Sequence, residues 1–372
     1  MKKIFFTCCL LITFAISSQT QGDPITIGTN YTINSTILDQ DREVQIYLPD
    51  SYGTSKEKYP VLYILDGQRF FTNGVSIQKS SQAPLDIPEM IVVGINSSRE
   101  LRRALFGNGD KFTSFIKNEV ISFVDFKYRT NKERVIFGWE AAAYYISEMI
   151  LEEKDLFSGA IITDGGFASE ETVKGFNSDK DIYLYMANSK KDIYYVSSSD
   201  DFSAILKKNN PKNLRWKYEL FNDEFHQTLP NIAMYKGIKY YYHNFPSLIF
   251  ENITAYINAG EIPYLESYFK ERAKRFGGES KIDNATKDRL IWLAENHDNF
   301  KYFSFFMEEF KDVLSTKRYA SAYWQNRFGQ FYLKYKDYKN AIKFFEIGIK
   351  KYPNTQFDEL MKKGLKDAQK HN

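Results

Sequence analysis

The sequence predicts an α/β fold, in which helices flank a sheet, followed by an all-helical C-terminal extension. Two continuous apolar runs, residues 61–65 and 90–95, are typical of strands buried on both faces. Over residues 23–245, short β-branched or aromatic runs alternate with stretches of helical periodicity, as in a sheet layered by helices. From residue 246 onward the strand pattern ends. We therefore expect an α/β domain over 23–245 and a helical extension over 246–372.

The first 22 residues have the pattern of an export signal. Two lysines near the start precede an apolar run over residues 4–16, and small and polar residues follow it. That run is too short to span a membrane. The only two cysteines, Cys8 and Cys9, lie inside this segment, so a chain that begins after it would hold no thiol. We expect an exported protein, periplasmic or secreted, without a membrane span.

Composition limits the function classes. With 372 residues, 43% of them hydrophobic and 17% aromatic, the chain can bury a sizeable core. A net charge of +3 without a basic stripe, zinc-finger spacing or RNA-binding signature argues against nucleic-acid binding. The α/β region carries no metal-ligand spacing, phosphate loop or dinucleotide fingerprint. We therefore expect neither a metal nor a cofactor.

Periodicity predicts the elements of the α/β region in order. Residues 43–48 alternate apolar and polar side chains, as an edge or antiparallel strand does. Residues 111–124 place four apolar side chains on one helical stripe. A β-rich run at 135–137 leads into a helix over 142–153. Three more strands are expected at residues 159–162, 182–186 and 216–220.

The extension is expected to be helical throughout. Residues 248–276 predict one long helix that the pair Gly277-Gly278 ends. Residues 322–355 match the spacing of a tetratricopeptide repeat at Gly329, Tyr332, Ala341, Phe345 and Pro353. One repeat cannot bury its own apolar face, so it must stack on helices within 287–314 or on the α/β domain. We interpret it first as a helical cap and second as a surface for a protein partner.

Residues 134–145, RVIFGWEAAAYY, have the frame of a nucleophile elbow without a nucleophilic hydroxyl. A β-rich run meets Gly138, and a helix-like run follows. In a G-x-S-x-G elbow, the serine sits on that sharp turn between strand and helix. Here Glu140 takes the central position, and three alanines follow it. A carboxylate cannot perform a serine's acyl-transfer chemistry, so the question of enzymatic activity depends on this residue.

Together with this elbow, four further segments resemble the Putative esterase family of α/β-hydrolases, which includes esterase D-like and iron-siderophore esterases. They are YPVLYILDGQRF (59–70), IVVGINSSRELRR (91–103), LFSGAIITDGG (156–166) and FNDEFHQTLP (221–230). The helical tail with its late repeat is similar to the C-terminal extension of some secreted members. The resemblance implies an α/β-hydrolase fold and, as the ancestral reaction, hydrolysis of carboxylic esters such as acylated sugars or siderophores.

The resemblance also assigns candidate site residues. It places the nucleophile at Glu140, so that role does not carry over, and the catalytic histidine at His226. The oxyanion donors would be the backbone N–H groups of Ala141 and of the loop around Gly67 and Gln68.

The acid follows the strand at 182–186, where Asp192 is the best match and Asp200 and Asp223 are fallbacks. Arg99, in an N-x-x-R motif, would order a loop or bind an anionic substrate group, unless it only forms a surface salt bridge.

Three interpretations of Glu140 compete. In the first, the elbow is degenerate and the protein is a pseudo-esterase that binds a ligand or a partner. In the second, Glu140 is a carboxylate nucleophile, as Asp is in related hydrolases. In the third, another residue supplies the chemistry. Ser147, about two helical turns further along, points away from the turn. An ion pair between Glu140 and His226 would raise the pKa of the imidazole, which is the wrong tuning for a general base.

We interpret the protein as a catalytically impaired or inactive ester hydrolase homologue, a pseudoenzyme that keeps a cleft for an ester, acylated-sugar or siderophore-like molecule. The alternative is an active hydrolase that uses Glu140 and His226 in atypical chemistry.

Overall fold

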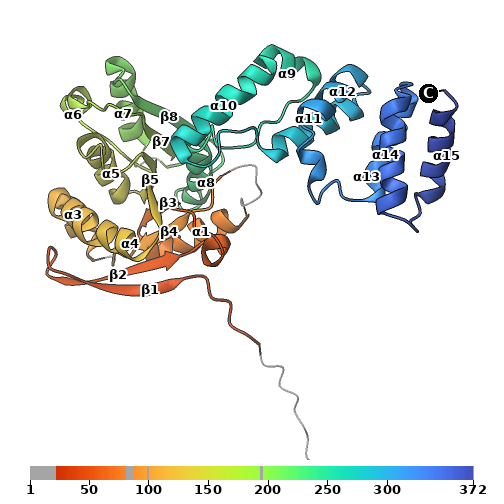
Figure 1. The fold of residues 1–372 in the computed structure, drawn as a ribbon. Helices are drawn as coiled ribbons and strands as arrows, with labels where there is room; N and C mark the ends of the chain where they lie inside the picture. Colours follow the sequence, from red (N-terminus) through yellow and green to blue (C-terminus); the bar gives the residue numbers. More distant parts are fainter. Residues whose placement is uncertain (1–21, 81–86, 99, 193–195, 372) are drawn as a thin grey trace, which may run out of the picture.

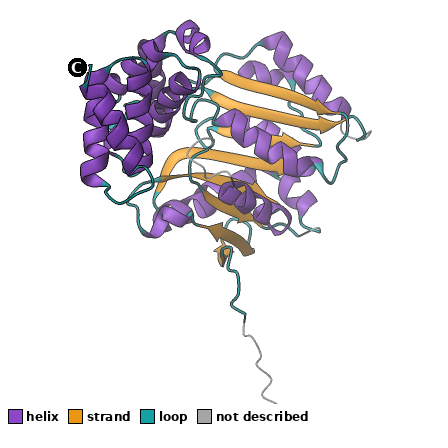
Figure 2. Cartoon of the chain, turned by 90° about the vertical axis from the view of Figure 1, so that its right-hand side faces the viewer, coloured by secondary structure: helices purple, strands orange, loops and turns teal. Residues whose placement is uncertain are grey.

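The structure, a computed structural model, describes residues 22–80, 87–98, 100–192 and 196–371. One mixed sheet forms the centre of the α/β part, in the order β1-β2-β4-β3-β5-β6-β7-β8 (Figures 1 and 2). The pairs β1–β2 and β2–β4 are antiparallel. The remaining neighbours, β4-β3-β5-β6-β7-β8 in sheet order, are parallel to one another. The strands are β1 (Thr29–Ser35), β2 (Gln40–Tyr47), β3 (Tyr59–Leu65), β4 (Ile91–Ile95), β5 (Thr130–Trp139), β6 (Gly159–Thr163), β7 (Ile182–Ser189) and β8 (Leu214–Phe221).

Helices cover both faces of this sheet, and each face has its own apolar layer. Along β3, Val61, Tyr63 and Leu65 belong to one layer. Leu62 and Ile64 belong to the other, which packs against α1 and α8. This double burial explains the unbroken apolar run. The helical segments of the α/β part are η1 (Asp50–Gly53), α1 (Gly67–Ser80), α2 (Arg102–Gly107), α3 (Gly109–Phe115), the π-helical η2 (Ile116–Ile121), α4 (Ser122–Lys127), α5 (Ala141–Glu152), α6 (Glu170–Gly175), α7 (Val196–Asn209) and α8 (Leu229–Tyr241).

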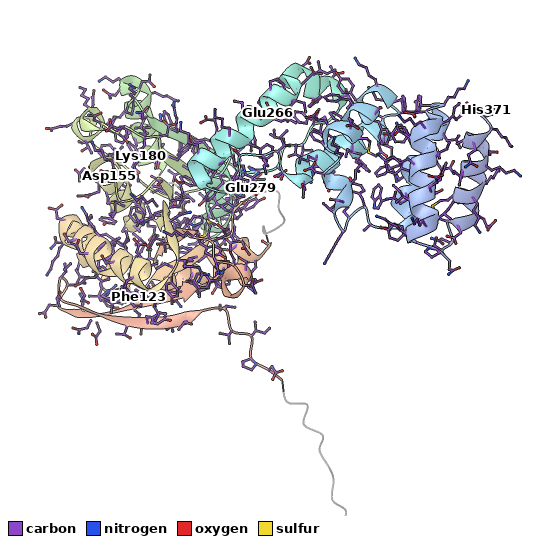
Figure 3. All side chains as sticks on the ribbon, in the orientation of Figure 1. Phe123, Asp155, Lys180, Glu266, Glu279 and His371 are labelled. Carbon is purple, nitrogen blue, oxygen red and sulfur yellow. The ribbon has the colours of Figure 1, made fainter. Side chains whose placement is uncertain are left out.

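The C-terminal extension is helical and builds a third apolar cluster entirely from residues 253–368. Its far end, near His371, lies away from Phe123 on the α/β part (Figure 3). Its elements are α9 (Ile253–Ala259), α10 (Glu261–Phe276), α11 (Asn284–Asn296), α12 (Phe300–Glu309), η3 (Val313–Ser315), α13 (Ala322–Lys334), α14 (Tyr338–Lys351) and α15 (Asp358–Gln369).

The structure confirms the predicted fold class and corrects several elements. The strands predicted within the α/β region are present, with ends that differ by a few residues. Strand β1 was not predicted, because its alternation is carried by Thr and Asn side chains that lie mostly at the surface. The single helix predicted over 248–276 is wrong. Gly260, at φ 110°, ends α9 and redirects the chain into α10.

The parallel strands bring their carboxyl ends to one edge of the sheet, where ligands bind in open α/β sheets. Asp66, Glu140 and Asp164 each follow such a strand end directly, after β3, β5 and β6. All three have positive φ, of 56°, 51° and 54°. Left-handed backbone at non-glycine residues is strained, and such strain is concentrated at functional sites. Within the described ranges, no helix has both the length and the apolar character needed to cross a membrane.

Candidate active site

Glu140 stands at the tip of the elbow, between the end of β5 and the start of α5. Its backbone has φ 51° and ψ −119°. The peptide N–H of Glu140 donates to the carbonyl of Thr163 at 3.1 Å, and its own carbonyl accepts from Ala143 N at 2.8 Å. A Cβ on Gly138 would lie 2.5 Å from Ile146 Cδ1, so the close approach of α5 to β5 requires glycine there. The strained turn of an elbow is therefore present, with a carboxylate in the central position.

Both oxygens of the Glu140 carboxylate are bonded. Oε2 accepts a hydrogen bond from Arg102 Nη1 at 2.9 Å, and Oε1 pairs with Nε2 of His226. The Glu140 side chain is 18% exposed and that of His226 is 20% exposed. The contact between Glu140 and His226 is therefore shielded from most of the solvent, which strengthens it.

Arg102, the partner of Glu140 Oε2, forms hydrogen bonds or ion pairs through all three of its guanidinium nitrogens. Nη2 lies 2.8 Å from Asp66 Oδ2, and Nε donates to the same carboxylate at 3.0 Å. Nη2 also donates to the backbone carbonyl of Trp139 at 3.1 Å. Asp66 is itself buried and accepts a hydrogen bond from the Ser97 hydroxyl. Arg102 thus joins the carboxylates that follow β3 and β5.

His226 lies between acidic groups on both ring nitrogens. Opposite Glu140, Nδ1 hydrogen-bonds Asp192 Oδ2 at 2.5 Å and lies 3.7 Å from Asp164 Oδ1. Burial alone would lower the pKa of His226, but the hydrogen bonds to Glu140 and Asp192, with the nearby Asp164, raise it above its ordinary value. The arrangement therefore favours the imidazolium form, which has no lone pair with which to accept a proton.

Asp164 is a second acid behind the histidine. Its side chain is fully buried, and burial together with the neighbouring Asp192 raises the pKa of Asp164 to about 8, against the opposing effect of His226. Among the described residues, Oδ1 of Asp164 has no hydrogen-bond partner. At neutral pH this carboxyl is therefore largely protonated, while Asp192 serves as the bonded acid.

Acidic and basic side chains alternate along the resulting network. It runs from Asp66 through Arg102, Glu140 and His226 to Asp192. In a serine hydrolase, the position next to Nε2 belongs to the nucleophilic hydroxyl. Here a carboxylate takes that position and is itself held by a guanidinium.

The expected oxyanion donors lie at two helix N-termini. Ala141 is the first residue of α5, and Gly67 and Gln68 open α1. The N–H groups of a first helical turn have no partner within the helix. No described residue accepts a hydrogen bond from the backbone N–H of Ala141 or Gln68. The Gln68 side chain accepts from Ser97 N at 2.9 Å, which fixes this turn beside Asp66.

Other predicted residues do not meet at the site. Arg99 lies outside the described residues. Asp192, and neither Asp200 nor Asp223, is the acid on Nδ1 of His226. Ser147 is buried and donates to the carbonyl of Ala143 at 2.7 Å, so its hydroxyl is directed back along α5.

Sequence reasoning missed Arg102, Asp66 and Asp164. A signal existed for the two acids, since each directly follows an apolar strand run, in LDG and TDGG. For Arg102 the signal was ambiguous, because three arginines fall within residues 99–103.

One group in the described part of the chain could hold a metal ion. The ligand atoms of Asp164, Asp192 and His226 lie within 4.8 Å of one another. These atoms come from three separate strand ends, so no local spacing in the sequence could have revealed them. In the present geometry, Asp192 and His226 are hydrogen-bonded to each other, and a metal would have to displace the proton between them.

Comparison with known proteins agrees with this fold. The model of the family described as Putative esterase matches residues 35–248, more than half of the chain. An IroE-like serine hydrolase from Shewanella oneidensis superposes with a TM-score of 0.57 at 22% identity, covering 76% of this chain and 98% of that one. An uncharacterised protein from Capnocytophaga ochracea superposes with a TM-score of 0.61 at 18% identity, covering 92% and 99%.

A curated relative, the uncharacterized protein YbbA of Bacillus subtilis, is 25% identical over 107 residues, which are 25% of this chain. The match spans only 43% of that relative's length.

Proposed function

This chain belongs to the Putative esterase family, and from that membership we propose that it is a catalytically silent ester hydrolase homologue that binds its ligand without cleaving it. The observation that carries the proposal is the pairing of Glu140 Oε1 with His226 Nε2. It replaces the contact between nucleophile and base on which acyl transfer depends.

The silence has two physical causes. First, the position that carries a serine in a G-x-S-x-G elbow carries no hydroxyl here. Second, the general base is disabled, because Glu140 occupies the nucleophile's place at Nε2 and stabilises the imidazolium form of His226. A general base must be neutral at working pH, so restoring only one of the two functions would leave the site inactive. A single substitution of Glu140 by serine changes both.

An active hydrolase with atypical chemistry is the second candidate. Glu140 would attack the alkyl carbon of an ester and expel the carboxylate, and a water activated by His226 would then cleave the resulting alkyl-enzyme ester. The intact pair of His226 and Asp192 is the observation in favour of this route. Against it, attack requires a free carboxylate oxygen, and both oxygens of Glu140 are held by cationic partners.

For the ligand, we propose an ester, an acylated sugar or a siderophore-like small molecule. The N–H groups of Ala141 and Gln68 have no described acceptor and stay available for a ligand carbonyl or carboxylate. Substitution of a neighbouring side chain leaves such backbone donors in place, which explains how binding survives the loss of chemistry.

We also propose that residues 1–22 direct export and that the helical extension, with a tetratricopeptide-like repeat at 322–355, caps the fold or receives a protein partner. The charged start, apolar run and small exit of the first segment support export. The close approach of α13 to α14, where a Cβ on Gly329 would lie 2.5 Å from Phe345, supports the repeat.

The test is hydrolysis of p-nitrophenyl acetate and butyrate by the chain from residue 23 onward. Wild type, Glu140→Ser, His226→Ala and the double variant of these two substitutions are assayed together, with Arg103→Gln as an exposed control from the same segment. We expect no turnover by wild type and weak turnover by Glu140→Ser that the second substitution abolishes. Wild-type turnover that is lost in the single variant His226→Ala would contradict the proposal of a catalytically silent protein and would support the atypical hydrolase.

A further inference from the structure

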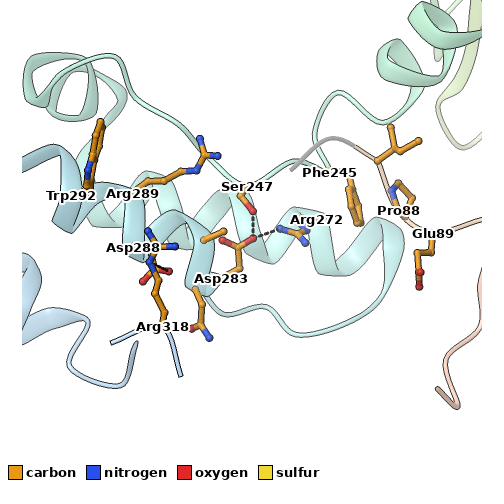
Figure 4. Close-up of a pocket in the computed structure, with 13 residues that line it drawn as sticks. Pro88, Glu89, Phe245, Ser247, Arg272, Asp283, Asp288, Arg289, Trp292 and Arg318 are labelled. Atoms are coloured by element: carbon orange, nitrogen blue, oxygen red, sulfur yellow. Dashed lines mark hydrogen bonds and ion pairs between the residues drawn. The ribbon is translucent and has the colours of Figure 1, made fainter. Parts of the chain in front are cut away.

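A cavity of about 870 Å³ lies where the segment at Pro88 meets the helical extension (Figure 4). Its walls come from residues 87–89, from the segment around Phe245, from α10 and α11, and from Arg318 ahead of α13. Pockets that bind small organic ligands typically have volumes of about 300–1,000 Å³. None of the side chains in the network around Glu140 contributes to these walls, so this is a separate site.

Helix α11 presents one continuous face to the cavity. Ala285, Asp288, Arg289 and Trp292 line it and follow each other at the spacing of a single helical face. The opposite face of α11 is buried in the core of the extension through Leu290, Ile291, Leu293 and Ala294. Trp292 is 46% exposed, which is unusual for so large an apolar ring. The cavity face of α11 thus combines a cation with an aromatic surface.

Two of the three arginines that line the cavity form ion pairs with acids of the same lining. Arg272 pairs with Asp283 at 2.8 Å, and Asp283 also accepts from the Ser247 hydroxyl and caps α11 (Figure 4). Arg318 pairs with Asp288 at 3.3 Å.

Arg289, by contrast, has no ion pair or hydrogen bond with any residue in the described ranges. Glu89, the third acid of the lining, accepts a hydrogen bond from the hydroxyl of Ser51.

We propose that this cavity binds a planar organic carboxylate, with Arg289 as its counter-ion and Trp292 as its stacking surface. A guanidinium matches a carboxylate bidentately, and such charge-assisted bonds are the strong ones. A half-exposed indole three residues further along the same helix face offers a flat apolar surface at the distance of one helical turn. The proposal does not depend on the fate of Glu140.

The test is a titration of the chain from residue 23 onward with 2-naphthoate, by calorimetry and by quenching of tryptophan fluorescence. The neutral isostere 2-naphthamide is titrated in parallel. We expect saturable binding of the naphthoate and at least tenfold weaker binding of the amide. Arg289→Gln should weaken naphthoate binding by about tenfold, the loss of one charge-assisted pair, and leave the amide unaffected. Trp292→Leu should weaken the binding of both probes.

The matched control is Arg215→Gln, an exposed arginine on β8 that pairs with Asp181 outside this cavity. Thermal unfolding of each variant confirms that it is folded. Absence of saturable naphthoate binding would overturn the proposal, and so would equal affinity for acid and amide. An Arg289→Gln variant that binds naphthoate as tightly as Arg215→Gln would place the probe elsewhere and reject this site.

Discussion

Arg102 holds Glu140 from the side opposite to His226. Its Nη1 lies 2.9 Å from Glu140 Oε2, and its other nitrogens hold the buried carboxylate of Asp66. The guanidinium therefore pairs with two acids at once, at adjacent strand ends of the sheet. Glu140 is tolerated at the elbow because this cation, together with an imidazolium, offsets the cost of its partial burial.

Removing that cation is expected to destabilise the fold. In Arg102→Met, the largely buried Asp66 and Glu140 lose their counter-ion, and we expect the free energy of unfolding to fall by about 2–4 kcal/mol. Urea denaturation followed by circular dichroism measures the change. Arg103→Gln serves as the control, because Arg103 is exposed. Equal stability of the two variants would show that Arg102 does not support this network.

Close packing of the elbow gives a second prediction. In Gly138→Ala, the new methyl group would meet Ile146 and the backbone of Ala142, so we expect a loss of about 1–3 kcal/mol from overpacking. Gly175→Ala is the matched control, since a Cβ there meets nothing within 4 Å. Denaturant titration of both variants measures their free energies of unfolding. A Gly138→Ala protein as stable as the control would contradict the close approach of α5 to β5.

The buried acid Asp164 predicts a pH dependence. Its folded-state pKa of about 8 exceeds the unfolded value of 3.8, so the folded state retains a proton that the unfolded state releases between these values. The contribution of Asp164 to stability is complete below pH 3.8 and is lost as pH rises to about 8. His226, whose pKa is also raised, acts in the same direction above its unfolded value.

Asp164→Asn should remove most of this dependence, because an amide stays neutral in both states. We expect the unfolding free energy of wild type to fall between pH 5 and pH 8 more steeply than that of Asp164→Asn. Chemical denaturation at several pH values gives both slopes. Parallel slopes for the two proteins would mean that Asp164 is ionised in the folded state.

The sequence alone supports much of this fold for specific reasons. Strands β3 and β4 were predictable because burial on both faces leaves an unbroken apolar run. Strand β1 was not, because an edge strand has one neighbour and needs few apolar side chains. The end of α9 at Gly260 had a local signal, because glycine often ends a helix. The helical pattern on both sides of Gly260 nevertheless favoured one continuous helix.

At the site, the elbow frame and the family resemblance predicted Glu140, His226 and Asp192, and the structure brings these three side chains together. The pairing of Arg102 with Glu140 was not accessible, since it depends on how the loop after β4 turns into α2. The raised pKa of Asp164 depends on its burial and on Asp192, which follows a different strand. No single-sequence pattern encodes either relationship.

The most direct test of the central claim is the protonation state of His226, measured by NMR pH titration of the ring carbons in histidine-labelled protein. The chain has four histidines, so His226→Ala identifies the signal. The ion-pair network predicts an imidazolium whose pKa lies above the ordinary value of 6.5 and falls when Glu140 is replaced by Gln. A His226 that titrates at or below 6.5 in the wild type, unmoved in Glu140→Gln, would show a neutral base free to act and would contradict the proposed silence.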